Sequence, residues 1–331
     1  MKKIFFLSIL LVFSSNIFCQ QIRICADSIK SSFRGLSVVN DNIVWVSGSN
    51  GTVGKSLDAG KTWQWIRIKG FDKTDFRDIE AFDDKTAVIM AVDEPAYILR
   101  TSDGGENWEK VYENHTKGMF LDAMDFSDDE NGIVVGDPIK DRIFIMRTSD
   151  GGKTWQNMPD KERPVADSGE AFFAASGTNV RELSKPGWIA VSGGLSSHIF
   201  IGDKEITLPL LQGKESTGAN SVAIKNDKNI LVVGGDFLQK DVTTGNCIYS
   251  RDGGKTWLQP ETPPSGYRSC VEYLSGKKWL TCGLNGVDIS SDDGANWQKI
   301  SNESFHVCRK AKKGTTVYFA GADGRVGKLE Q

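Results

Sequence analysis

The chain alternates between short runs rich in β-branched and aromatic residues and turns rich in glycine, asparagine and aspartate. In the clearest stretch, such runs cover residues 33–39, 43–48, 51–56 and 63–68, with a turn at 40–42. Hydrophobic and polar positions that alternate between turns of this kind are typical of β-strands. No stretch shows the 3.6-residue period of an amphipathic helix. The sequence therefore predicts an all-β protein built from four-stranded units.

An octapeptide recurs between the third and fourth runs, with the pattern hydroxyl-x-Asp-x-Gly-x-Thr/Asn-Trp. Its five copies cover residues 56–63, 101–108, 148–155, 250–257 and 290–297. The tryptophans that end them are 45, 47, 102 and 40 residues apart, so the long gap holds two units, one of which has lost its octapeptide. Four-stranded units at this period are typical of β-propeller blades.

The repeat predicts seven units. They start near Phe33, Phe76, Phe120, Ala171, Asn220, Tyr267 and Phe305. The seventh has only three runs, and residues 21–25 can supply its fourth strand. Pairing the two ends leaves no open sheet edge. We therefore expect one domain, residues 21–331, folded as a seven-bladed β-propeller of four-stranded antiparallel blades and closed by the N-terminal strand.

The chemistry of the octapeptide fits a structural role. Its aspartate can accept hydrogen bonds from backbone N–H groups of its own turn, and its glycine can take a positive φ. We expect the threonine or asparagine to bond a loop carbonyl and the tryptophan to be buried between blades. These structural residues are Asp58, Asp103, Asp150, Asp252 and Asp292 with Trp63, Trp108, Trp155, Trp257 and Trp297.

This octapeptide is identified as the Asp-box, or bacterial neuraminidase repeat. The whole mature chain, with seven units and a degenerate fourth, resembles the photosystem II stability/assembly factor-like propellers. The resemblance implies a binding or assembly scaffold. The Asp-box is also shared by sialidases and other glycosidases, so it indicates the fold more strongly than an activity.

The N-terminus predicts export. Lys2 and Lys3 precede an apolar run over residues 4–13 and a polar stretch, as in a signal peptide covering residues 1–20. The run is too short for a lasting transmembrane helix, and no later segment is long enough. We expect a periplasmic or extracellular protein without lipid anchoring at Cys19, because no small residue precedes that cysteine.

Charge and cysteine content narrow the function further. Forty basic and 43 acidic residues are interspersed, so nucleic acid is not an expected partner. Three histidines and no C-x-x-C motif predict no metal site, no residue set argues for a cofactor, and we expect a monomer. Cys270 and Cys282 flank a predicted hairpin and could form a disulfide; equally, these and Cys25, Cys247 and Cys308 could be free thiols.

The starts of the innermost strands suggest an anion site. In propellers of this kind the Asp-boxes lie on one face and ligands usually enter at the other. Arg268, His306, Arg34 and Arg77 occupy equivalent starts in consecutive blades six, seven, one and two. Such an arc could bind a carboxylate or phosphate. Alternatively, each arginine pairs with a carboxylate of a neighbouring blade; the candidates are Asp78, Glu80, Asp122 and Asp125.

Blades three to five have longer connections rich in glycine and polar residues. Binding and catalytic residues often lie on long loops of this kind. The candidate residues there are Asp137, Asp167, Glu170, His198, Lys214 and Asp236. We expect a non-enzymatic scaffold that docks a protein, an anion or a carbohydrate on the face opposite the Asp-boxes. The alternative is a glycoside hydrolase that uses Asp137 with Glu170 or Asp236. A sialidase would have six blades and an Arg-Ile-Pro motif, which this sequence lacks.

Overall fold

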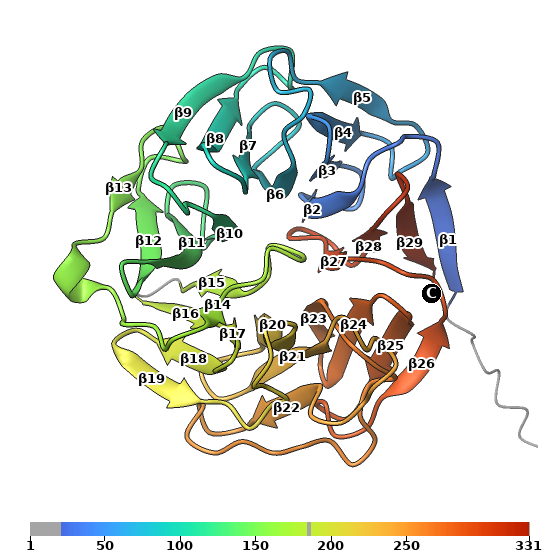
Figure 1. Ribbon diagram of the computed structural model, residues 1–331. Helices are drawn as coiled ribbons and strands as arrows, with labels where there is room; N and C mark the ends of the chain where they lie inside the picture. The colour runs from blue at the N-terminus through green and yellow to red at the C-terminus, as the bar shows by residue number, and fades with distance from the viewer. Residues whose placement is uncertain (1–20, 184–186, 331) are drawn as a thin grey trace, which may run out of the picture.

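The computed structural model describes residues 21–183 and 187–330, and the predicted signal peptide lies outside these ranges. Seven antiparallel sheets surround a central channel (Figure 1). Blades one to three are β2 (Phe33–Val38), β3 (Val44–Gly48), β4 (Thr52–Ser56) and β5 (Gln64–Arg67); β6 (Phe76–Ala81), β7 (Ala87–Ala91), β8 (Ala96–Thr101) and β9 (Glu109–Asn114); and β10 (Leu121–Phe126), β11 (Gly132–Ile139), β12 (Arg142–Thr148) and β13 (Gln156–Asn157).

The other blades follow the same order from the channel outward. Blades four to six are β15 (Val180–Glu182), β16 (Trp188–Val191), β18 (His198–Ile201) and β19 (Lys204–Thr207); β20 (Thr217–Ile224), β21 (Ile230–Asp236) and β22 (Cys247–Ser250), whose outer edge bridges to Leu258; and β23 (Cys270–Ser275), β24 (Lys278–Gly283), β25 (Gly286–Ser290) and β26 (Gln298–Ser301). The described helical structure is one 3₁₀ turn, η1 (Asp160–Glu162), and no helix in the described ranges is long and apolar enough to cross a membrane.

Blade seven joins the two ends of the chain. It contains β27 (Val307–Lys310), β28 (Val317–Ala320), β29 (Val326–Glu330) and, outermost, β1 (Gln21–Ala26). β1 pairs antiparallel with β29, with Ile22 opposite Leu329, and the two strands lie side by side in Figure 1. The predicted closure by the N-terminal strand is confirmed.

The hydrophobic core lies in layers between neighbouring blades. One layer joins blades one and two through Trp45, Phe76 and Ile79, all nearly inaccessible to solvent. The strands alternate so that both sheet faces meet a neighbour, which explains why most inner strands are buried on both sides. Packing therefore ties each blade to the next around the ring.

The Asp-boxes form the predicted hairpin turns. Asp58 Oδ1 accepts hydrogen bonds from the N–H groups of Lys61 and Thr62 at 3.1 and 2.9 Å, and Gly60 has φ of 76°. The Thr62 hydroxyl donates to Asp58 Oδ2 at 2.6 Å, not to a loop carbonyl as expected. This bond, first, and the backbone donors hold the pKa of Asp58 near 2, so the carboxylate is charged.

The Asp-box tryptophans pack against the layers between blades, as expected. Trp108 borders the layer between blades one and two, and Trp257 borders that between blades four and five. Trp297 lies within the layer between blades five and six. The octapeptide thus fixes both a turn and an inter-blade contact.

Strand register defines two faces. The end of the innermost strand, Val38, lies opposite Val44, which lies opposite Ser56 at the start of an Asp-box. The ends of the innermost strands therefore point to the Asp-box face. Their starts, such as Phe33 opposite Gly48, point to the other face, called here the opposite face.

Blade four departs from the expected start near Ala171. Its innermost strand is β15, which begins at Val180. The strand β14 (Glu170–Ala171) instead pairs with β17 (Gly193–Gly194), which extends the sheet of blade five. The residues between β14 and β15 are thereby free to enter the channel.

Candidate functional site

Residues 172–179, the channel segment, cross the centre of the ring. Figure 1 shows the chain before β15 reaching the middle of the channel. Arg34 of blade one donates to the Ala175 carbonyl at 3.3 Å, and Arg309 of blade seven donates to the Gly177 carbonyl at 3.1 Å. Ser176 Oγ donates to the carbonyl oxygen of Ser269, in blade six, at 2.7 Å. Contacts with several blades make this segment a partition between the two channel mouths.

The mouth on the Asp-box face holds a pocket of about 540 Å³. All seven blades contribute the ends of their innermost strands to its lining. Ion pairs cross it: Lys312 with Glu80, Arg181 with Asp125 at 3.3 Å, and Arg309 with Glu272 at 3.9 Å. Because opposite charges are already paired, the pocket has no strong net preference for an anion.

This pocket was not among the expected sites. Its signal in the sequence is a charged residue near the end of five of the seven innermost strands: Glu80, Asp125, Arg181, Glu272 and Arg309. Arg181, which belongs to blade four, could not be aligned from the repeat because β15 begins later than expected. The structure also shows why Glu80 and Asp125 are not partners of the predicted arginine arc.

Three members of the predicted basic arc lie together at the opposite mouth. Arg77 pairs with Asp75 at 2.8 Å and lies over the Phe120 ring at 5.9 Å. His306 Nε2 is 3.3 Å from the Ser32 hydroxyl. Burial, first, and then Arg34 and Arg77 lower the pKa of His306 to about 3, so its ring is neutral at neutral pH. The mouth therefore carries two permanent cations, not four.

The fourth member, Arg268, is fully buried and used within its own blade. Its Nε donates to Asp288 at 2.7 Å, and Nη1 donates to Tyr267 O at 2.7 Å and to Asn285 Oδ1 at 2.6 Å. Its Nη2 bonds Ser265 Oγ at 2.8 Å and also Asp288. All five guanidinium donors are satisfied, so Arg268 has none left for a ligand.

Glu170 and His198, from the irregular blades, are brought together. His198 Nδ1 lies 3.0 Å from Glu170 Oε1, which also accepts from the Ser192 hydroxyl. The bond to Glu170 raises the pKa of His198. Glu170 has no exposed side-chain surface, so a sugar cannot reach it without rearrangement.

Two other acidic candidates, Asp137 and Asp236, support local backbone. Asp137 accepts from the Phe172 N–H at 2.9 Å, where the channel segment begins, and burial raises its pKa to about 6. Asp236 accepts from Leu238 N–H at 3.0 Å. Neither is hydrogen-bonded to Glu170 in the structure, and Glu170 itself is covered. The geometry does not favour the predicted hydrolytic pairs.

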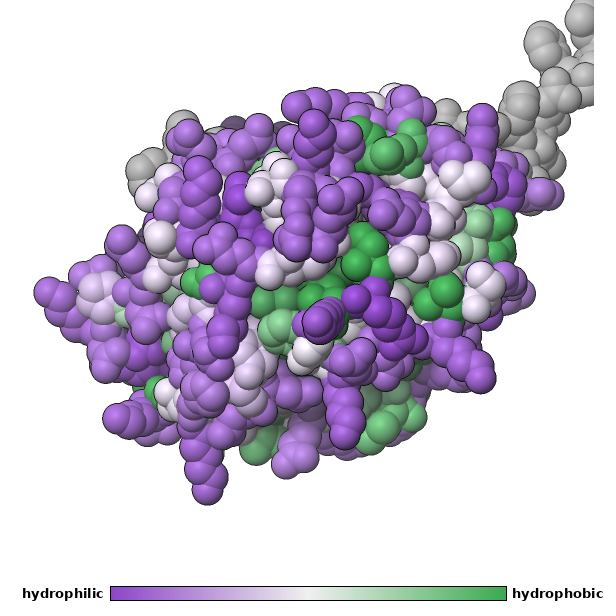
Figure 2. Space-filling view, turned by 90° about the horizontal axis from the view of Figure 1, so that it is seen from above, coloured by the Kyte–Doolittle hydropathy of each residue, from purple (hydrophilic) through white to green (hydrophobic). Residues whose placement is uncertain are grey.

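Large exposed hydrophobic side chains gather on the opposite face near blades four and five. Leu195, Phe237 and Leu238 are 47%, 37% and 76% exposed. Their loops flank one segment, since Gly213 N–H donates to the Gly194 carbonyl at 3.2 Å and Phe237 N–H donates to Ser216 at 3.2 Å. By contrast, the outer rim over β5 and β9 is mostly hydrophilic, with a group of hydrophobic side chains near its middle (Figure 2).

Comparison with known proteins agrees with this architecture. The sequence profile described as Photosynthesis system II assembly factor YCF48 matches residues 72–185, and that of the BNR/Asp-box repeat matches residues 248–257. The chain is an Asp-box propeller resembling that assembly factor family. A search of curated proteins finds no match.

Solved structures show the same fold. One described as YCF48 bound to D1 peptide is 15% identical, covers 96% of each chain and has a TM-score of 0.68. YCF48 from Cyanidioschyzon merolae is also 15% identical. The match covers 93% of the present chain and 98% of the YCF48 chain, with a TM-score of 0.68. The WD40 β-propeller domain of Doa1 is 13% identical, with 94% and 97% coverage and a TM-score of 0.62.

Proposed function

We propose that this protein is a non-enzymatic scaffold that docks an extended segment of a partner protein on the opposite face. The observation that carries the proposal is the exposed hydrophobic group Leu195, Phe237 and Leu238 on the same face as the cationic mouth. Exposed apolar groups rimmed by polar residues mark interaction surfaces. We call these three residues and Arg77 the docking surface.

The chemistry of the docking surface defines the partner. Arg34 supplies positive charge, and Arg77 adds less because it already pairs with Asp75. Burial, first, and then Arg77 lower the pKa of Arg34, so an added anion would be favoured there. Leu238 and Phe237 supply apolar contact area, while Phe173 and Tyr267 support the Phe237 ring at 5.9 and 6.4 Å. A segment with hydrophobic side chains followed by a carboxylate fits both parts.

Two further points support this function over hydrolysis. The carboxyl group of Glu170 is covered, as described above, and the similar propeller described as YCF48 bound to D1 peptide binds a peptide. Export through a signal peptide over residues 1–20 is part of the proposal and would place the partner in the cell envelope or outside it. Fractionation of cells expressing the full chain tests the location.

A phage-displayed library of random dodecapeptides tests the docking. We expect selected peptides to combine hydrophobic residues with an acidic group, and synthetic copies to bind the purified protein. Leu238→Ser and Arg77→Met should each weaken binding at least about tenfold, which corresponds to about 1.4 kcal/mol.

Leu57→Ser is the matched control, because Leu57 is 50% exposed but lies in an Asp-box on the other face. Equal weakening by Leu57→Ser, unchanged affinity of the two docking-surface variants, or failure to select any peptide would each contradict the proposal. Acetate should compete with peptide binding and methylammonium should not, because only an anion is attracted by the arginine side chains. This competition tests the contribution of the positive charge separately.

A further inference from the structure

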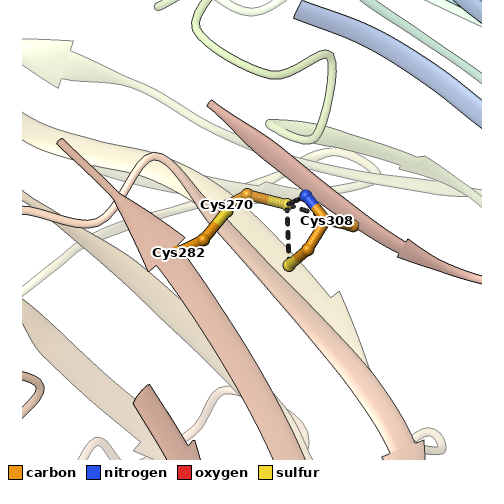
Figure 3. Close-up of side chains that lie close together, drawn as sticks. All are labelled: Cys270, Cys282 and Cys308. Atoms are coloured by element: carbon orange, nitrogen blue, oxygen red, sulfur yellow. Dashed lines mark hydrogen bonds between the residues drawn. The ribbon is translucent and has the colours of Figure 1, made fainter. Parts of the chain in front are cut away.

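Three cysteines from two blades meet in the core. Cys270 lies on β23, Cys282 lies opposite it on β24, and Cys308 comes from β27 of the next blade. Their sulfur atoms all lie within 4.8 Å of one another, and the Cys270 and Cys308 sulfurs are 3.7 Å apart. Figure 3 shows the three side chains converging from their strands. We call them the thiol cluster.

The spacing of the cluster suits one metal ion. A metal–thiolate bond is about 2.3 Å long, so three sulfurs in a plane around an ion lie about 4.0 Å apart. The Cys270 and Cys308 sulfurs, 3.7 Å apart, are close to this spacing, and all three sulfurs lie within 4.8 Å of one another. No described histidine or carboxylate joins the group as a fourth ligand.

The number and type of ligands select the metal. Zinc in proteins takes four ligands, or three and a water. Here all three cysteines are 0% exposed, so bulk water does not reach the fourth position. Soft thiolate ligands favour copper(I), and copper(I) has no requirement for a fourth ligand. We propose that Cys270, Cys282 and Cys308 form a buried three-thiolate site for copper(I).

The surroundings moderate the negative charge that binding creates. The Cys308 N–H points to the Cys270 sulfur at 3.4 Å. Burial, the largest influence, raises the pKa of the Cys282 and Cys308 thiols, so these two cysteines keep their protons in the metal-free protein. Binding breaks S–H bonds, forms copper–sulfur bonds and releases up to three protons; the oxidation state of copper does not change.

Burial determines how the ion enters. The cluster belongs to the layer that also contains residues of blade seven, the blade completed by β1 and β29. An ion reaches it while the ring is folding or when blade seven opens, since the closed core offers no solvent contact. We therefore expect efficient loading during refolding and slow loading of the native protein.

Anaerobic refolding of the chain with copper(I), followed by desalting, tests the site. We expect one copper per chain, resistant to a brief bicinchoninate wash, and X-ray absorption from about three sulfur neighbours at about 2.3 Å. Cys270→Ala and Cys308→Ala should each reduce retained copper at least tenfold. The control Cys247→Ala removes a buried cysteine of blade five outside the cluster and should retain copper.

Three results would overturn the proposal. One is wild-type protein that retains no copper after refolding. Another is Cys270→Ala that melts cooperatively and still retains copper like the control. The third is a mass 2 Da below the reduced chain with loss of cluster thiols in metal-free protein, because a disulfide would then occupy the cluster. If an alanine variant fails to fold, the sulfur count from wild-type absorption still decides.

Discussion

The guanidinium of Arg309 donates a hydrogen bond of 3.1 Å to the carbonyl oxygen of Gly177 and so links blade seven to the channel segment. Gly177 itself has φ of 63° and lies against Asp78 of blade two. The channel segment is therefore held by close backbone approaches that only a small residue permits.

Replacing Gly177 tests this packing. An alanine Cβ would lie 2.2 Å from Asp78 Oδ2, and Asp78 cannot move easily because Ile79 and Met124 N–H groups bond it at 2.8 and 2.7 Å. We expect Gly177→Ala to lower the free energy of unfolding by about 2–5 kcal/mol, from backbone strain plus overpacking. Urea denaturation measures it.

Gly202→Ala is the control for the backbone contribution. Gly202 has φ of 62°, nearly that of Gly177, but no atom lies within 4 Å of its added Cβ. Gly202→Ala should lower the free energy of unfolding by only about 1–2 kcal/mol. Equal losses in the two variants would mean that the contact with Asp78 contributes nothing.

The buried ion pair of blade six makes a second prediction. Arg268→Met leaves the buried Asp288 carboxylate without its cation, so we expect a loss of about 3–5 kcal/mol in unfolding free energy. Arg23→Met should lose less than about 1 kcal/mol, because Arg23 and Glu330 are 42% and 51% exposed. Comparable losses would contradict the assignment of Arg268 to a structural network.

The pKa values of His198 and His306 should be shifted in opposite directions from that of a free histidine. The bond to Glu170 raises the pKa of His198, whereas burial lowers that of His306 to about 3. NMR of the imidazole protons, assigned with His198→Gln and His306→Gln, should show a protonated His198 and a neutral His306 at pH 5. A protonated His306 there would contradict the structure of the opposite mouth.

These shifts also affect stability. The stabilisation from His198 is present below its unfolded pKa of 6.5 and is lost as pH rises through the higher folded value. That from His306 is present above pH 6.5 and is lost as pH falls from 6.5 toward 3. Unfolding free energies of each Gln variant, compared with wild type across this range, should show slopes of opposite sign.

Asp137 provides a separate pH test. Burial raises its pKa from 3.8 to about 6, so the folded state holds a proton that the unfolded state releases. Its stabilisation is present below pH 3.8 and is lost as pH rises to 6, a difference of up to about 3 kcal/mol. Asp137→Asn should remove this dependence in urea titrations at pH 4 and 7. If the unfolding free energy of Asp137→Asn depends on pH as in the wild type, the dependence arises from other groups.

Local patterns predicted most of the fold. The regular blades and the Asp-box turns follow from repeated short-range chemistry, such as Asp58 with Thr62. The closing strand was predicted by counting strands, because the seventh unit has only three of its own. The fourth innermost strand was misplaced, because Glu170–Ala171 has strand-like neighbours but pairs with Gly193–Gly194 instead. The repeat does not align these two segments, so their pairing depends on tertiary contacts.

The candidate site was predicted only in part. Arg34, Arg77 and His306 lie together because equivalent positions of adjacent blades meet around the channel. Arg268 occupies the same repeat position, yet Asp288 of its own blade takes its donors, which no repeat alignment can show. The pocket on the Asp-box face was missed because its paired charges come from five different blades.

The sequence by itself determined the number of blades and their turns, because these depend on residues close together in the chain. It also predicted how the ends join, because the incomplete seventh unit lacks one strand and residues 21–25 can supply it. Tertiary structure decided which charged groups remain available, how residues 172–179 cross the channel, and that Cys270, Cys282 and Cys308 meet. Those outcomes depend on neighbours from other blades and on burial. Both are set only when the ring closes and side chains compete for the same partners.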